Sequence, residues 1–400
     1  MSIAKTTAEY EGWLRSQTTL VESELNTKHE KMACSEFPFL RATFYRWAHL
    51  FPRHCPHLYD APRVLGVGDL HIENFGTWRD GEGRLNWGVN DFDEACLLPY
   101  TNDLVRLATS AYFALTDGAN PLSLDFKDAC RAIQEGYLKG FEKPRPFILA
   151  EDHGWLRNIV IRKLVDIDSS DKGKGQDDLF KKFYKKYTTL DEIEGTVPEE
   201  ALAALNACFP QPLPEYEIKH REAGLGSLGR QRFTAIARDW QGGIIVREVK
   251  ALVSSAWLWA NQEREESAAA ALTAKTIYYP EIVAKSVRSA DPWLMVFGRW
   301  AVRRLGPDAF KVELPDLELK RNEKEALTKK LFEAMGKEIA NIHSFASGSS
   351  NGSGDHLKAL SNHFQSVEWL FSGAMTMVDQ THEDFRDWKK EGYQCPPEKD

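Results

Sequence analysis

The sequence predicts an α+β protein. Segments with apolar residues at helical spacing lie toward both ends of the chain, and short runs typical of strands lie between them. A proline-rich break at residues 210–214 separates two groups of these runs. The chain has 400 residues, a length that allows two or three compact parts.

Before the break, helices are expected to precede the first strands. Residues 1–30 are polar and charged and predict a helical leader. The aromatic-rich stretch 37–51 predicts a helix that Pro52 ends. Short apolar runs at residues 64–67 and 85–89 then predict two strands, because the second run alternates as a half-buried strand does.

Further helices and a polar segment complete this first half. The stretch that begins at Asp103 has an apolar stripe at helical spacing, and residues 117–118 (Asp-Gly) are expected to stop it. Another helix is expected over residues 124–142. Residues 150–213 are mixed and polar, with a surface loop expected at residues 172–178.

After the break the pattern changes to strands. Short strands are predicted at residues 216–219, 232–237, 244–249, 293–297 and 300–302. Residues 251–275 and 281–290 are expected to be helical, and a long helix is expected from Lys320. A loop rich in Ser and Gly at residues 347–354 and a final helix over about 356–388 complete the chain.

Charge and composition argue against several classes of function. The net charge is −8 and the chain has no long basic run, which disfavours nucleic acid as the main partner. No apolar run has the length of a membrane span or forms a signal-peptide core, so a cytoplasmic protein is expected. The six cysteines include no Cys-x-x-Cys pair, and reduced thiols are expected rather than a disulfide framework.

Two acidic turns follow the first two predicted strands. The first is Gly68-Asp69-Leu70-His71-Ile72-Glu73-Asn74-Phe75, and the second is Asn90-Asp91-Phe92-Asp93-Glu94-Ala95. Ordinary turns are one interpretation, because Asp and Asn side chains bond their own backbone in turns. Two strand ends that bring Asp69, Asn74 and Asp91 together would instead form a metal-assisted site. Mg²⁺ takes oxygen ligands, and a further carboxylate can accept a proton.

A glycine-rich turn, Gly-Leu-Gly-Ser-Leu-Gly, lies at residues 224–229. A dinucleotide-binding fingerprint needs a helix after the turn, whereas residues 232–237 predict a strand. Strand, glycine turn and strand is the arrangement of the kinase loop that covers ATP phosphates, and Lys250 lies where kinases place a phosphate-pairing lysine. Glu266 and Glu281 are candidate partners of Lys250. A glycine-rich hairpin with a solvated lysine is the structural alternative.

The two acidic turns resemble those of aminoglycoside phosphotransferases and related kinase-like enzymes. Residues 68–74 resemble their His-Gly-Asp-x-His-x-x-Asn catalytic loop, and residues 90–95 resemble their Ile-Asp-Phe-Glu-x-Ala metal-binding turn. The helix start at Asp103 also fits this family. Val67 stands where the family has a mostly structural histidine, so this departure does not exclude the chemistry.

A closer resemblance extends over nearly the whole chain. The sequence is similar to an uncharacterised bacterial family, domain of unknown function 2252. The matching pieces are Lys31-Met32, residues 37–41, the Gly-Asp-x-His-x-x-Asn-Phe-Gly run, residues 90–95, the glycine turn, Lys250, Arg303-Arg304-Leu305 and Ile342-His343. Glu36 and Ala42 depart from the usual Pro and Gly of that family, and neither position touches the expected chemistry.

The order of these parts predicts a rearranged chain. In ordinary kinases the glycine loop and the lysine precede the catalytic loop, whereas here residues 224–250 follow Asp69 and Asp91. The resemblance therefore implies a circularly permuted, two-lobed protein-kinase-like fold, which is tolerated when the original ends lie close together. The helix that ends at residues 342–343 resembles the helix before the phosphotransferase catalytic loop and favours a cut just after it. Residues 37–51 could fill the same place.

Four parts are expected along the chain. Residues 1–65 are expected to form a helical leader that packs on the large lobe, and residues 66–213 to form the large lobe with the catalytic and metal-binding loops. Residues 214–307 are expected to form the small nucleotide-binding lobe, and residues 308–400 to return to the large lobe as helices.

The resemblance implies ATP-dependent phosphoryl transfer assisted by Mg²⁺. Asp69 is expected to accept the proton of the acceptor hydroxyl, and His71 to fix the catalytic loop or contact the transferred phosphate. Asn74 and Asp91 are expected to hold Mg²⁺, with Asp93 on a second ion. The residues expected to hold the nucleotide phosphates, or to orient the lysine that does, are Gly224, Gly226, Ser227, Gly229, Lys250, Glu266 and Glu281.

Three alternative functions stay open. A catalytically inactive nucleotide-binding regulator, a pseudokinase, would have the same fold without turnover. A metal-dependent phosphoesterase would use the acids and His71, although that class usually needs more histidine ligands. Nucleotidyl transfer on the same scaffold is the third. The acceptor, a small molecule or a protein, and the oligomeric state are not predicted.

Overall fold

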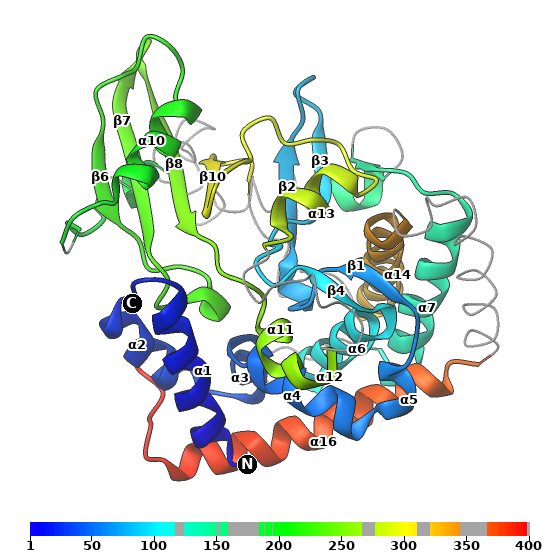
Figure 1. Cartoon of the computed structure of the whole chain (residues 1–400). Coiled ribbons are helices and arrows are strands. Elements are labelled where there is room, and N and C mark those ends of the chain that lie inside the picture. Colours follow the sequence, from blue (N-terminus) through cyan, green and yellow to red (C-terminus); the bar gives the residue numbers. More distant parts are fainter. Residues whose placement is uncertain are drawn as a thin grey trace.

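The structure of the protein is a computed structural model whose described residues form helices and three antiparallel sheets, which confirms the α+β class (Figure 1). The residues that it describes are 1–116, 124–149, 153–158, 184–187, 189–193, 195–265, 277–309, 321–344 and 366–397. The loops expected at residues 172–178 and 347–354 lie outside this part of the chain.

The first helices are α1 Ile3–Gln17, α2 Glu22–Met32, α3 Glu36–Ala42, α4 Phe44–His54 and α5 Pro56–Tyr59. The leader is therefore helical, as predicted, but the aromatic-rich stretch forms two helices because Thr43 leaves helical geometry (φ −118°, ψ 38°). Pro52 does not end α4. A proline leaves the carbonyl four positions earlier without an N–H partner. Here that carbonyl, of Ala48, accepts a hydrogen bond from Nδ2 of Asn261 at 3.1 Å instead.

Two small antiparallel sheets present the acidic turns. Their strands are β1 Arg63–Gly66, β2 Phe75–Arg79, β3 Leu85–Val89, β4 Cys96–Pro99 and β5 Phe147–Ile148. β1 pairs with β4, and β3 pairs with both β2 and β5. The first acidic turn runs from β1 through the short helix η1 Ile72–Asn74 to β2, and the second follows β3. Both predicted strands of this region are confirmed.

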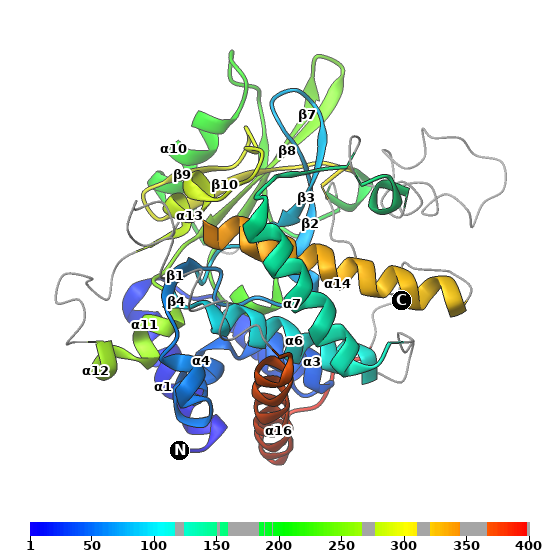
Figure 2. The same cartoon turned by 90° about the vertical axis from the view of Figure 1, so that its right-hand side faces the viewer.

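Four long helices form most of the helical part, with α16 along its outer side (Figure 1). They are α6 Tyr100–Thr116, α7 Phe126–Glu142, α14 Arg321–His343 and α16 Glu368–Lys390. α7 and α14 pack against each other (Figure 2) so closely that a Cβ at Gly136 or Gly336 would collide with the backbone of the other helix. Among the helices of the described residues, none has both the length and the apolar composition of a membrane span.

The second half contains a five-stranded antiparallel sheet, with strand order β6-β7-β8-β10-β9 (Figure 1). Its strands are β6 Glu217–His220, β7 Arg232–Trp240, β8 Gly243–Ala251, β9 Met295–Phe297 and β10 Trp300–Leu305. All five predicted strands are therefore confirmed, with shifted ends. β7 and β8 are joined at Gln241-Gly242, where both residues have positive φ (51° and 84°), as a tight hairpin requires.

The helix α10 Glu199–Cys208 packs on one face of this sheet. Ala201, Ala204 and Leu205 of the helix share an apolar core with Val249 and Trp300 of the sheet. α10 thus belongs with the sheet in its packing, although it precedes the proline-rich break in the chain.

The region after β8 differs from the helix predicted over residues 251–275. Ala251 is still in the strand, and the N–H of Leu252 donates to the carbonyl of Arg299 at 2.7 Å. The helices begin only at α11 Ala256–Ala260, which Ser255 caps, and continue in α12 Gln262–Glu265. The next described helix is α13 Tyr279–Lys285, which is shorter than the predicted stretch 281–290 at its carboxyl end.

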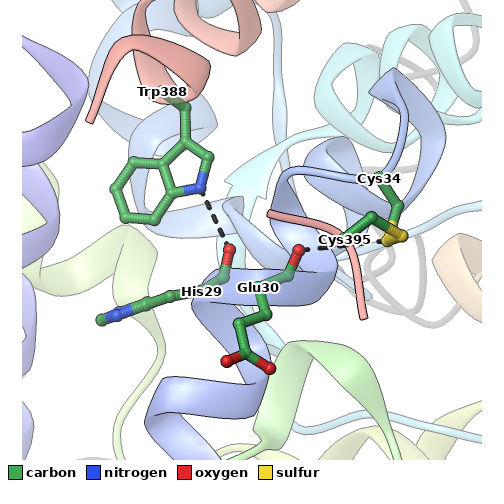
Figure 3. Close-up of a disulfide and its surroundings, with 5 residues drawn as sticks. All are labelled: His29, Glu30, Cys34, Trp388 and Cys395. Atoms are coloured by element: carbon green, nitrogen blue, oxygen red, sulfur yellow. Dashed lines mark hydrogen bonds between the residues drawn. A yellow bond between two sulfur atoms is a disulfide. The ribbon is translucent and has the colours of Figure 1, made fainter. Parts of the chain in front are cut away.

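One cysteine pair contradicts the expectation of reduced thiols. Cys34, after α2, and Cys395, after α16, form a disulfide (Figure 3). The pair forms because α16 returns the chain to α2, where Nε1 of Trp388 donates to the carbonyl of His29 at 3.1 Å. The remaining cysteines, Cys55, Cys96, Cys130 and Cys208, are buried free thiols, so there is no wider disulfide framework.

Candidate functional site

One pocket brings together the two acidic turns, the glycine turn and α3. Its open space, including the mouth to solvent, is about 480 Å³. The predicted site residues that line it are Asp69, His71, Asn74, Asp91, Asp93, Gly224, Gly226 and Ser227. Arg41, Glu94 and Arg230, which were not predicted, line it too.

The buried Asp103 of α6 holds the first acidic turn. Its carboxylate accepts hydrogen bonds from the backbone N–H groups of Val67 at 2.6 Å and Gly68 at 2.9 Å. His343, at the end of α14, contacts the same carboxylate through Nε2 at 3.0 Å. Gly68 has φ +80°, and a Cβ there would collide with the carbonyl of Glu94, so the turn requires glycine at this position.

One oxygen of Asp69 is held by a buried guanidinium, and the other faces the glycine turn. Arg106 donates to Oδ1 from Nε at 2.9 Å and from Nη2 at 2.5 Å. Oδ2 lies 3.1 Å from the position that a Cβ of Gly226 would take. Burial raises the pKa of Asp69 above its ordinary value, and Arg106 opposes that rise. Oδ2 is therefore the oxygen of Asp69 that can accept a proton.

Asn74 ties the two acidic turns together. Its Nδ2 donates to the backbone carbonyls of Asp69 and Asp91, each at 3.2 Å. Since the amide nitrogen makes these bonds, Oδ1 is the atom of Asn74 that can serve as a ligand. Oxygen atoms of this type suit a hard cation.

Lys250 reaches the second acidic turn from β8. Its Nζ lies 2.6 Å from Oδ1 of Asp93 and 3.2 Å from Oδ1 of Asp91. The side chain of Asp93 is 8 % exposed, and within the described chain neither of its oxygens has a hydrogen-bond partner besides this ion pair. Burial and the neighbouring Asp91 raise the pKa of Asp93 to about 6, while Lys250 opposes the rise.

This arrangement fits Mg²⁺. Asp91, Asp93 and Oδ1 of Asn74 could supply oxygen ligands, and the poorly bonded carboxylate of Asp93 has capacity for a cation. In the part of the chain that the structure describes, no group of three or more His, Cys, Asp or Glu side chains could hold a metal by itself. Oxygens from a substrate would therefore have to complete the coordination, as phosphates do at many Mg²⁺ sites.

The helix α2 fastens the glycine turn. Nζ of Lys28 donates to the carbonyl of Gly226 at 3.0 Å, and the carboxylate of Glu24 accepts from the N–H of Gly229 at 2.9 Å. Lys28 is buried, and burial lowers its pKa to about 8. The leader thus determines where the glycine turn lies.

The turn itself is a short 3₁₀ helix, η2 Leu225–Ser227. The N–H of Ser227 donates to the carbonyl of Gly224, and the N–H of Leu228 donates to that of Leu225. With Gly229 bonded to α2, the later N–H groups of the turn are all engaged. This corrects the expectation that the whole turn cradles phosphate, because only its first N–H groups can do so.

Of the two glutamates expected to orient Lys250, the one that the structure describes is not at the site. Glu281 is half-buried on α13 and pairs with Lys285. Glu266 lies outside the described residues. The spacing of charged residues in a predicted helix could not distinguish a solvated surface pair of this kind from a site residue.

A buried carboxylate on the same strand as Lys250 was missed. Glu248 pairs with Arg232 at 2.7 Å, with Arg303 at 2.7 Å and with Arg221. Although burial raises the pKa of a carboxyl, the three guanidiniums outweigh it and hold the pKa of Glu248 well below its ordinary value. Residues two apart on a strand share a face, so Glu248 and Lys250 lie on one cation-rich face of the sheet.

Residues 20–187 match the model of a family described as an uncharacterized protein conserved in bacteria (DUF2252). This match confirms the family resemblance over that stretch. Comparisons with curated proteins and with solved structures gave no match. The DUF2252 stretch contains both acidic turns and the helices that hold them, and it ends before the glycine turn.

Two arginines of the DUF2252 stretch, Arg41 and Arg106, were missed in the sequence, as was Arg230 beyond it. Arg106 lies on the face of the predicted helix opposite the apolar stripe, where a solvated charge is expected, so its burial in the structure had no signal in the sequence. Arg230 directly follows the glycine turn. Arg41 had no local signal, because α3 meets the pocket only through the tertiary fold.

Proposed function

We propose that the protein is an ATP-dependent phosphotransferase with a kinase-like fold and an acceptor hydroxyl as its second substrate. The main support is the meeting of two acidic turns from the first half of the chain with the glycine turn from the second half in one pocket. Lys250 joins the same group through Asp91 and Asp93. Phosphoryl transfer depends on this kind of positioning and charge neutralisation rather than on covalent chemistry.

The end of α14 supports a circularly permuted order of the kinase-like parts. His343 contacts Asp103, which holds the backbone at the start of the first acidic turn. The end of α14 and that turn are therefore neighbours in space, as they would be if the helix had once led directly into the turn. The five-stranded sheet with its glycine turn and lysine would be the small lobe.

The residues in and around the pocket would serve two roles, proton acceptance and metal binding. Asp69 would accept the proton of the acceptor hydroxyl through Oδ2, while Arg106 keeps the carboxylate in position. Asn74, Asp91 and Asp93 would hold Mg²⁺, which when bound would neutralise negative charge on the nucleotide phosphates. Lys250 would keep the two aspartates oriented toward the pocket.

The charge of the sheet face favours a polyphosphate. Arg221, Arg232 and Arg303 surround the single carboxylate of Glu248, which leaves an excess of positive charge beside the second acidic turn. Guanidinium groups bind phosphate oxygens through paired, charge-assisted hydrogen bonds. This face is therefore suited to the triphosphate of a nucleotide.

A nucleotide-binding regulator without turnover is the second candidate. The close contact of Arg106 with Asp69 favours it, because a paired guanidinium stabilises the carboxylate and weakens it as a base. A metal-dependent phosphoesterase is less well supported, since the described residues hold no cluster of three or more potential metal ligands. Nucleotidyl transfer would use the same site, and analysis of the products would distinguish it.

Calorimetric titration with ATP, with and without Mg²⁺, tests the proposal. We expect Mg²⁺-dependent binding to the wild type that Asp91→Ala loses. Absence of nucleotide binding by the wild type would contradict both the transferase and the regulator. Turnover by the wild type then separates these two, because only the transferase transfers phosphate. Asp69→Asn should retain nucleotide binding and lose that transfer, and turnover unchanged in this variant would exclude Asp69 as the base.

A further inference from the structure

Two arginines of the pocket have N–H groups that the described chain does not engage. Arg230 is 3 % exposed and donates from Nη2 to Glu94 at 2.7 Å and to the hydroxyl of Tyr10 at 3.3 Å. Its Nε and Nη1 have no hydrogen-bond acceptor among the described residues. Arg41 contacts Glu73 through Nη1 at 2.5 Å, and its buried Nε likewise has no acceptor there.

Both side chains line the pocket that contains Asp69. The nearest further carboxylate to Nη1 of Arg230 is that of Asp93, whose Oδ2 lies 3.8 Å away, beyond hydrogen-bond distance. Buried charged donors are costly when they lack an acceptor. An unsatisfied buried group in a native structure requires an explanation, and a bound anion would supply the missing acceptors.

We propose that Arg41 and Arg230 bind a phosphate-type anion in this pocket, beside Asp69. Each guanidinium is already positioned by one carboxylate, Glu73 or Glu94, and retains N–H groups for a second partner. A phosphate group offers several oxygens and matches the planar fork of an arginine. The inference builds on the proposed transferase and defines the charge of the group that lies next to its base, but binding of the anion requires neither metal nor nucleotide.

Substitutions of Glu73 and of Arg41 should change the affinity for the anion in opposite directions, and this contrast tests the proposal. Its carboxylate holds Nη1 of Arg41 and so competes with an anion for that guanidinium. Loss of this carboxylate should strengthen anion binding, whereas loss of Arg41 should weaken it. A purely structural ion pair would not produce opposite effects, because either substitution would break the same pair.

The experiment is calorimetric titration of the full chain with inorganic tripolyphosphate, in EDTA and at fixed low ionic strength. We expect saturable binding by the wild type, at least about tenfold weaker binding by Arg41→Gln, and several-fold tighter binding by Glu73→Gln. The matched controls are Arg131→Gln and Asp128→Asn, which change the same charges in an exposed pair on α7 and should leave the affinity unchanged. Arg230→Gln is less suitable, because it would leave Glu94 buried without its partner.

Either of two results would overturn the proposal: no saturable binding by the wild type, or equal affinities of the wild type and Arg41→Gln. If Glu73→Gln does not bind tripolyphosphate more tightly than the wild type, the proposed competition between Glu73 and the anion for Arg41 is refuted. Because the probe contains neither Mg²⁺ nor nucleoside, these outcomes are independent of whether the protein transfers phosphate.

Titration of Arg41→Gln with ATP and with ADP in Mg²⁺ identifies the source of the anion. Weaker binding of ATP with unchanged binding of ADP would assign it to the terminal phosphate of the nucleotide. Unchanged binding of both, together with weaker tripolyphosphate binding, would assign it to a phosphate group on the acceptor.

Discussion

The carboxyl group of Glu338 should make stability depend on pH in a direction that the structure defines. This side chain is buried beside β3, where it accepts hydrogen bonds from the N–H of Val89 at 3.3 Å and from Nδ2 of Asn341 at 3.2 Å. Burial raises the pKa of Glu338 from 4.5 to about 7, against the attraction of Arg288. Between these two pH values the folded protein retains a proton that the unfolded chain has lost.

The magnitude follows from the size of that change. One pKa unit corresponds to about 1.4 kcal/mol, so Glu338 changes the free energy of unfolding by about 3 kcal/mol. Because the folded-state pKa is the higher one, its contribution is fully present below pH 4.5 and is lost as the pH rises through 7. Gln does not titrate, so the stability of Glu338→Gln relative to the wild type should increase by about 3 kcal/mol between pH 4.5 and pH 8.

Urea denaturation of both proteins at several pH values, at constant ionic strength, measures this difference. The other titrating groups are shared by the two proteins and cancel in the comparison. Glu333→Gln, on the same helix, is the matched control. Lys139 and Lys337 outweigh burial there and lower the pKa of Glu333, so the relative stability of this variant should fall as the pH rises. A stability difference for Glu338→Gln that does not vary with pH would refute the reasoning.

Three further predictions concern parts that hold the site together. Asp103→Ala should lower the free energy of unfolding by about 3–5 kcal/mol, since two buried N–H groups lose their acceptor, and a loss below 1 kcal/mol in urea titration would contradict this. Cys34→Ser should destabilise the protein by about 2–4 kcal/mol; a dithiol reductant should lower the melting temperature of the wild type alone, and an equal effect on both proteins would exclude the bond to Cys395 as the cause. Lys250→Met should destabilise the protein by about 3 kcal/mol by removing the nearer of the two cations that pair with the buried Asp93. Mg²⁺ should restore part of that loss in thermal melts, and no recovery would argue against a cation site there.

Local motifs explain why much of the site could be predicted from the sequence. The acidic turns need only a strand, a glycine that tolerates positive φ at Gly68, and a few polar residues close together in the chain. The glycine turn also has a local pattern. The partners of these motifs come from distant segments, so Arg41 beside the glycine turn and Arg106 on Asp69 required the tertiary fold.

The incorrect predictions have the same physical cause. The Ala-rich composition after Lys250 favours a helix, but Leu252 instead bonds to the backbone of Arg299, so sheet pairing overrides propensity. Pro52 stops a helix only when the carbonyl it leaves unpaired has no other donor, and Asn261 is such a donor from more than two hundred positions away. Neither of these distant partners, Arg299 and Asn261, can be recognised from the sequence around the predicted helix.

The bond between Cys34 and Cys395 also affects how the protein should respond to mechanical force. A pull applied to the two ends of the chain would pass through the sulfur–sulfur bond, and the residues between the cysteines would carry almost no load. The part of the fold between the cysteines would therefore resist tensions that unravel an unbridged chain, whereas α1 and α2, which precede Cys34, would carry the load. A single cut in the backbone within that closed ring would likewise leave the two fragments covalently joined, until a reductant separates them.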